Sequence, residues 1–150
     1  MKRFLLAAAA ASLLGACVSV TEAPAAADGA RPMLTVLTSD DPETQLMALI
    51  LTRAARTEGS RPQILLCSAA GDLALRSPPA EALAPLQPKG ASPAGLLRQL
   101  MADGVKVEVC AIYLPNRQFG AEALEDGVGV ATPAEIARVF TADNATILSF

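Results

Sequence analysis

The sequence contains no histidine and no tryptophan, and its aromatic residues are four phenylalanines and one tyrosine. Without histidine, Ser-His-Asp and Cys-His catalysis are excluded, as are the usual histidine-containing zinc and iron sites. Acid–base chemistry would therefore depend on carboxylates, lysine, tyrosine or a thiol. We expect no metal and no cofactor. The core must be built from Leu, Val, Ile, Ala and Met.

The chain also lacks a basic stripe. Its formal net charge is −3, and loss of Lys2 and Arg3 would take it to −5, because residues 1–16 contain no acid. Nucleic-acid binding needs clustered Lys and Arg to neutralise phosphates, so we expect no nucleic-acid partner. Neither GxGxxG nor GxxxxGK[ST] is present, so no motif supports nucleotide binding.

The first 16 residues have the pattern of a signal peptide. Lys2 and Arg3 form a positive start, and the apolar stretch Phe4–Ala16 follows. A transmembrane helix needs about 20 apolar residues, whereas a shorter stretch is typical of a signal peptide. We therefore predict that residues 1–16 are removed and that the protein is exported.

Two sites of cleavage remain open. Leu14–Cys17 resembles a lipobox, which predicts lipidation of Cys17 and an outer-membrane or periplasmic lipoprotein that touches the membrane only through its lipid anchor. The alternative is cleavage near Ala27, after small-x-small sequences, which would release a soluble periplasmic protein without Cys17. In either case we predict that 17–32 is a linker.

Residues 33–150 are predicted to form one α/β domain. Apolar and β-branched segments predict strands at 33–38, 63–67, 105–110, 128–130 and 145–150. Capping residues followed by proline, and glycines that end helices, predict helices at 42–58, 94–103, 121–126 and 133–142. This alternation predicts a parallel sheet of about five strands with helices on both faces.

Two segments have unusual composition. Apolar residues cover most of the circumference of helix 42–58, which predicts burial between layers or against another subunit. Five prolines lie between Pro78 and Pro93, and we expect an irregular segment there with one helical turn near 80–84. Such long loops are often lids, binding loops or partner contacts.

Residues with useful chemistry follow three predicted strands. Asp40 and Asp41 follow the first strand, Cys67 the second and Cys110 the third, with Arg117 on the next loop. Ligands bind at the carboxyl ends of strands in open parallel sheets. The two aspartates could form a metal or acid–base pair, but their position before a proline favours helix capping. Cys110 is either a small buried apolar residue or a reactive thiol whose thiolate Arg117 stabilises.

The stretch Gly104–Tyr113, with its strand ending in Val-Cys, resembles the DsrE/DsrF-like family. So do the Asp-Asp-Pro start of the first helix and Gly127–Val130 before a capped helix. The resemblance covers nearly all of 33–150. It implies a three-layer α/β/α sandwich and a homo-oligomer. It also implies that Cys110 accepts a persulfide sulfur from one thiol protein and passes it to another.

The chain departs from the sulfur-relay members in two ways. Those proteins work in the reducing cytoplasm, whereas this chain carries an export signal, and segment 77–93 has no counterpart that we can assign. Two functions stay open, and with them the question of whether the protein is an enzyme. One is sulfur handling by Cys110. The other is a non-catalytic envelope binding module in which Cys67 and Cys110 are structural, and in that case a disulfide requires their strands to be neighbours.

Overall fold

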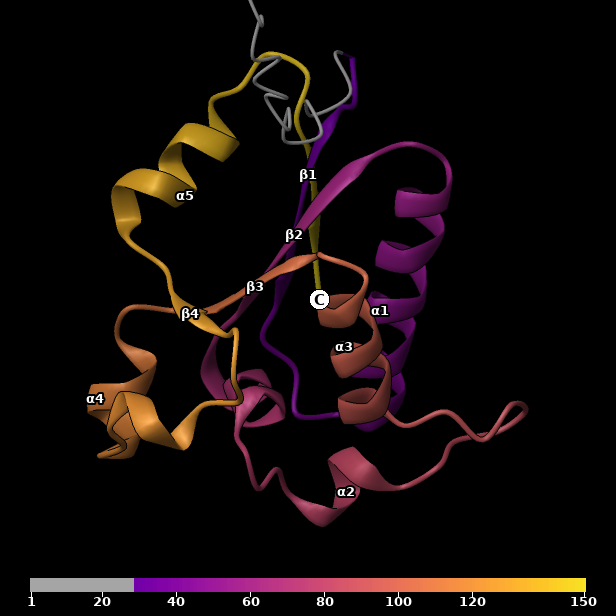
Figure 1. Ribbon diagram of the computed structural model, residues 1–150, viewed down its shortest axis with the longest axis vertical. Helices are drawn as coiled ribbons and strands as arrows, with labels where there is room; N and C mark the ends of the chain where they lie inside the picture. The colour runs from indigo at the N-terminus through magenta and orange to yellow at the C-terminus, as the bar shows by residue number, and fades with distance from the viewer. Residues whose placement is uncertain (1–28) are drawn as a thin grey trace, which may run out of the picture.

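The computed structural model describes residues 29–150 (Figure 1). The predicted signal peptide, the lipobox with Cys17 and the linker up to residue 28 lie outside this range. Among the helices of residues 29–150, none is both long enough and apolar enough to cross a membrane.

A single sheet of five strands forms the centre of the described chain. Every pair of neighbouring strands is parallel, and the order is β4-β3-β2-β1-β5. The prediction of a parallel α/β sheet is confirmed. The strands are β1 (Pro32–Leu37), β2 (Arg61–Leu66), β3 (Lys106–Val109), β4 (Gly129–Val130) and β5 (Thr146–Ser149).

Helices cover both faces of this sheet, as Figure 1 shows: α1 and α3 lie on one side and α5 on the other. The three-layer α/β/α arrangement is therefore confirmed. The helices are α1 (Pro42–Thr57), α2 (Ala80–Leu83), α3 (Pro93–Ala102), α4 (Tyr113–Arg117) and α5 (Pro133–Phe140). Two 3-10 helices, η1 (Ser68–Ala74) and η2 (Ala121–Ala123), complete the set.

The three long helices begin where their capping residues predict. The Asp41 carboxylate accepts the Thr44 N–H at 2.7 Å. Hydrogen bonding from the side chain and the backbone of Thr44 holds the pKa of Asp41 below its usual value. Ser92 caps α3 in the same way, and Thr132 opens α5 with a complete capping box. Asp41 is thus a helix cap, as the proline after it favours.

Helix α1 is not enclosed on all sides. Its inner residues Leu46 and Leu49 are buried, but Met47, Ile50 and Leu51 are 40–51% exposed. The expectation that α1 lies between two layers is wrong, because its main contacts within residues 29–150 are with β1, β2 and α3, and its outer side is exposed. Contact of its outer side with a second subunit stays a prediction.

The two faces of the sheet are unequally covered. The larger core cluster lies under α1 and α3, whereas the cluster under α5 contains four buried residues, among them Leu65 and Ile136. Side chains alternate between the faces along a strand. Cys67, two residues after Leu65, therefore points toward the thinly covered α5 side and packs against this smaller cluster, whereas Cys110 packs against both clusters.

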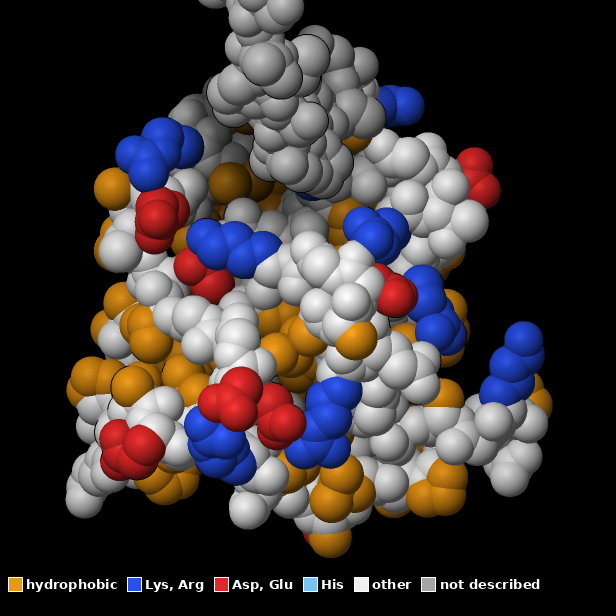
Figure 2. Space-filling view, viewed as in Figure 1, with side chains coloured by type: hydrophobic (Ala, Val, Ile, Leu, Met, Phe, Trp, Pro, Cys, Tyr) orange, Lys and Arg blue, Asp and Glu red, His pale blue; other side chains and the backbone are white. Residues whose placement is uncertain are grey.

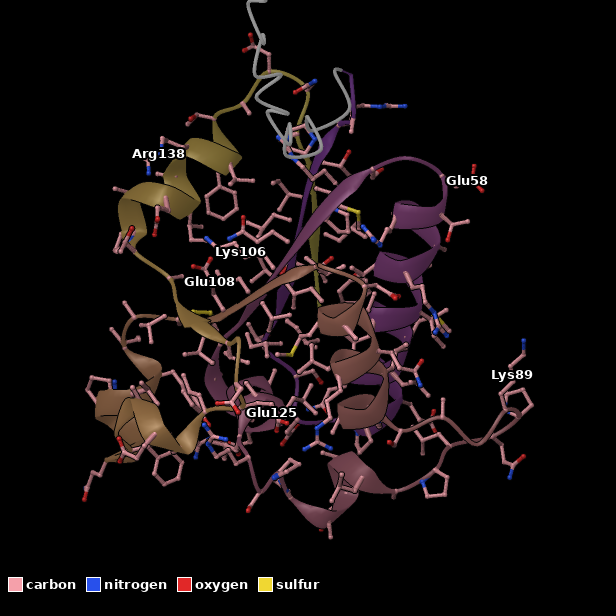
Figure 3. All side chains as sticks on the ribbon, in the orientation of Figure 1. Glu58, Lys89, Lys106, Glu108, Glu125 and Arg138 are labelled. Atoms are coloured by element: carbon pink, nitrogen blue, oxygen red, sulfur yellow. A yellow bond between two sulfur atoms is a disulfide. The ribbon has the colours of Figure 1, made fainter. Side chains whose placement is uncertain are left out.

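The segment between β2 and α3 is more ordered than expected. The helical turn near 80–84 is confirmed as α2, but η1 and an antiparallel bridge between Leu86 and Ala91 have no counterpart in the sequence prediction. The bridge closes a protruding hairpin that carries Lys89 (Figure 3). The prediction of a helix over 121–126 is wrong in its length, because only Ala121–Ala123 is helical, as the 3-10 helix η2.

Ion pairs link the segment just after η1, and helix α3, to the loop before β4. Arg76 Nη2 lies 2.5 Å from Asp126 Oδ1, and Arg98 Nη2 lies 3.1 Å from Glu125 Oε2. On the face drawn in Figure 2, basic and acidic side chains are mixed and do not separate by sign. These pairs connect the chain after η1 and helix α3 to the segment that leads into β4.

Candidate functional site

The two domain cysteines are direct neighbours at the carboxyl edge of the sheet. Leu66 pairs with Val109 in the β2–β3 ladder, so the next residues, Cys67 and Cys110, lie opposite one another. The Cys110 N–H donates to the Leu66 carbonyl at 2.9 Å. The Cα atoms of the cysteines are 5.2 Å apart and their sulfurs form a disulfide. The strand order thus satisfies the condition for a disulfide.

This disulfide lies in the wall of a pocket of about 620 Å³. The pocket contains the three site residues predicted within the domain, and Cys17 lies outside the described residues. Its lining residues are Cys67, Ser68, Cys110, Ile112, Tyr113, Asn116 and Arg117. Segments far apart in the chain meet at this pocket because η1 follows the carboxyl end of β2 and α4 follows that of β3. These ends lie at the lower edge of the sheet in Figure 1.

A second hollow of about 230 Å³ lies beside Cys110 under the start of α5. Its walls are almost entirely apolar and include Leu65, Ile112, Ala131 and Ile136. Cys110 lines both hollows, whereas Cys67 lines only the larger one. Cys110 therefore borders one hollow that includes the polar side chains of Asn116 and Arg117 and another that is almost entirely apolar.

Helix α4 replaces the loop expected after Cys110, and it is anchored by a buried tyrosine. The Tyr113 hydroxyl donates to Asp72 Oδ1 at 2.7 Å, and the ring packs against Gly71 of η1. Sequence reasoning missed the role of Asp72. The signal that could have found it is the single tyrosine, since a buried phenol needs a hydrogen-bond partner.

Arg117 lines the pocket, but its guanidinium also interacts with Asp72 and with the Tyr113 ring. Its Nη2 lies 3.4 Å from Asp72 Oδ2, and its guanidinium lies 5.8 Å from the centre of the Tyr113 ring. The expected role as a thiolate stabiliser therefore depends on the field that Arg117 projects into the pocket and is weakened by Asp72.

The chain turns out of β2 through a strained residue. Ser68 has φ 54°, in the left-handed region that residues with a side chain rarely adopt. This conformation turns the chain directly from Cys67 into η1, which brings Gly71 and Asp72 beside α4.

Asp40 does not join this group. It lines a separate pocket of about 210 Å³ with Asp72 and Glu81. Within residues 29–150, no three His, Cys, Asp or Glu side chains are grouped so that they could hold a metal ion.

The burial of Tyr113 predicts an unusual alkaline titration. Burial, and then the hydrogen bond to Asp72, raise the pKa of the phenol above its ordinary value of 10.0. The protonated phenol therefore stabilises the fold below about pH 10, and this contribution is lost as the pH rises through the folded-state pKa. Tyr113 is the only tyrosine and there is no tryptophan, so tyrosinate absorbance reports this group alone.

We expect no tyrosinate absorbance near pH 10 while circular dichroism shows the domain folded. Asp72→Asn is expected to lower the pKa of Tyr113 without restoring the ordinary value, because burial remains. Half-ionisation of the folded wild-type protein near pH 10 would contradict the buried, hydrogen-bonded position.

The chain resembles two solved structures over four-fifths of its length. It is similar to the YchN protein from E. coli, with a TM-score of 0.61, 23% identity, and coverage of 81% of this chain and 99% of that one. It is also similar to MTH1491 from Methanobacterium thermoautotrophicum, a protein of unknown function, with a TM-score of 0.60, 17% identity, and coverage of 80% and 99%. No family model and no curated protein matches the sequence. Both structures have the DsrE-like fold, and at these identities the likeness shows that this chain shares that fold.

Proposed function

We propose that this protein is an exported sulfur-handling protein that takes up a sulfane sulfur on Cys110 as a persulfide. The observation that carries the proposal is the position of Cys110 at the carboxyl edge of the sheet, in the wall of a pocket large enough for a small persulfide. The DsrE-like fold, which is the fold of sulfur-relay proteins, adds support.

Uptake requires the reduced form of the Cys67–Cys110 pair, because neither sulfur of a disulfide is a nucleophile. The Cys110 thiolate attacks the outer sulfur of a persulfide R–S–SH. The sulfur–sulfur bond of the donor breaks, R–S⁻ leaves, and the proton stays on the transferred sulfur as Cys110–S–SH. Arg117 stabilises the anionic thiolate from the pocket wall, against the opposing charge of Asp72.

Export and lipidation belong to the same proposal. The pattern of residues 1–16 and the lipobox at Cys17 support a protein held at the envelope by its lipid anchor, where the donor is a persulfide reaching the periplasm. The lipidated cysteine would then be separated by the linker from the two cysteines of the domain.

The proposal is tested by mixing the reduced domain with glutathione persulfide and trapping with an alkylating agent within seconds. Intact mass and peptide mapping should show one added sulfur atom on Cys110. The Cys110→Ser variant should fall to background, while Arg117→Gln should move the pH midpoint of uptake upward. Arg138→Gln is the matched control, since Arg138 is an exposed cation on α5 outside the pocket (Figure 3). Uptake by Cys110→Ser at the wild-type rate would refute the proposal.

A second candidate is a non-catalytic envelope binding module. The disulfide itself favours it, because a disulfide between neighbouring strands also serves as a structural link. In that case the domain should retain its disulfide in a mild dithiol buffer that reduces exposed, labile disulfides. It should also take up no sulfur after forced reduction.

A further inference from the structure

The sulfur-carrier proposal uses one cysteine, but the structure provides two that touch. Cys67 and Cys110 occupy facing positions just beyond the ends of neighbouring parallel strands, and their sulfurs are bonded. A persulfide on Cys110 would therefore form beside a second thiol in the same pocket wall.

Both cysteines are held by backbone hydrogen bonds that do not depend on the disulfide. The Cys67 N–H donates to the Leu37 carbonyl at 2.9 Å, and the Cys110 N–H donates to the Leu66 carbonyl at 2.9 Å. These bonds extend the β1–β2 and β2–β3 ladders by one residue each. The two sulfurs accordingly stay within reach of one another after reduction.

We propose that Cys67 is the resolving nucleophile for the Cys110 persulfide, so that the domain converts sulfane sulfur to hydrosulfide. This inference rests on the proposed function. The Cys67 thiolate attacks Cys110 Sγ, the bond from Sγ to the outer sulfur breaks, and HS⁻ leaves with the proton that this sulfur carried. The two thiolates are oxidised to the disulfide and the sulfane sulfur is reduced to sulfide. A dithiol reductant must then restore the pair for each further turnover.

The surroundings of Cys110 suit this step. The outer sulfur of a Cys110 persulfide needs space that Cys67 does not occupy, and Cys110 also lines a hollow of about 230 Å³ that Cys67 does not line. This hollow is lined by Leu65, Ala131 and Ile136, so it suits the small, neutral S–H group of the bound persulfide, whereas charged parts of the donor fit the larger pocket with Arg117. The substrate class is then a low-molecular-weight persulfide that enters from the larger pocket, where Asn116 and Arg117 can bind its polar groups.

In the test, one equivalent of glutathione persulfide is added to the reduced protein after removal of the reductant. Released hydrosulfide and the remaining domain thiols are then measured. The wild-type protein should release about one hydrosulfide per domain and end without alkylatable domain thiols. Cys67→Ser should keep the persulfide, extending its lifetime by roughly 1,000-fold, because a neighbouring thiol has an effective concentration of about millimolar against about micromolar external thiols. Cys67→Ala should behave like Cys67→Ser.

The outcomes separate the two proposals. If the wild type and Cys67→Ser both take up sulfur and hold it equally long, the resolving role of Cys67 is overturned and the carrier function stands. If neither takes up sulfur, the proposed function itself fails. The reduced wild type and Cys67→Ser both lack the disulfide, so matching circular dichroism spectra exclude a difference in folding as the cause.

Discussion

Reduction of the Cys67–Cys110 disulfide is expected to lower the free energy of unfolding by about 4 kcal/mol. The bond joins residues 43 positions apart, and in the chain-entropy model a link of that length strongly restricts the unfolded chain. A domain of this size is typically stable by about 5–15 kcal/mol, so the effect is a large part of the total.

Urea unfolding with and without a thiol-free reductant measures the difference. The double variant Cys67→Ser/Cys110→Ser is the matched control, because it should already have the lower stability and should not respond to reductant. A wild-type midpoint that does not move while mass analysis shows full reduction would mean that the disulfide adds little to stability. Such a result would remove the main argument for the structural role and leave the redox role of the pair.

Gly71→Ala is expected to destabilise the domain by about 1–3 kcal/mol, the usual effect of overpacking. A Cβ built on Gly71 would overlap the Tyr113 ring, which is itself buried. The backbone of Gly71 is not in the left-handed region, so the requirement for glycine is steric. Relief of the overlap would move Tyr113 away from Asp72 and open the floor of the pocket.

A double-mutant cycle isolates this contact. In a Tyr113→Leu background, Gly71→Ala should cost much less, because the ring that it strikes is gone. Tyr113→Phe is the control for the hydroxyl alone, since it keeps the ring and loses only the hydrogen bond to Asp72. Equal costs of Gly71→Ala in the wild-type and Tyr113→Leu backgrounds would contradict the proposed clash.

Local patterns predicted much of this fold because their causes are local. Asp41, Ser92 and Thr132 each open a helix through bonds to the next turn, so these three starts could be read without knowledge of the rest. The alternation of strands and helices likewise indicated the parallel sheet and its class. Helix α4 and the helix η1 were missed, since each is short and is held by contacts across the chain.

The candidate site shows the same division. Placement of Cys110 and Arg117 near the carboxyl edge follows from the strand that precedes them. The bond from Tyr113 to Asp72 joins residues 41 positions apart, and no spacing rule predicts it. The outer side of α1 shows a further limit of sequence patterns. Its apolar residues predict burial, but the pattern does not indicate which part of the protein, or which other subunit, covers them.

The sequence by itself determined what is absent and what is local: no histidine chemistry, a signal-like start, capped helices, and cysteines at the ends of two strands. Only the tertiary structure decided that β2 and β3 are neighbours, and hence that Cys67 and Cys110 share one pocket wall. The physical reason is that strand order depends on which helices cover which face of the sheet. That choice is made by packing across the whole domain and is not encoded in any short stretch of chain.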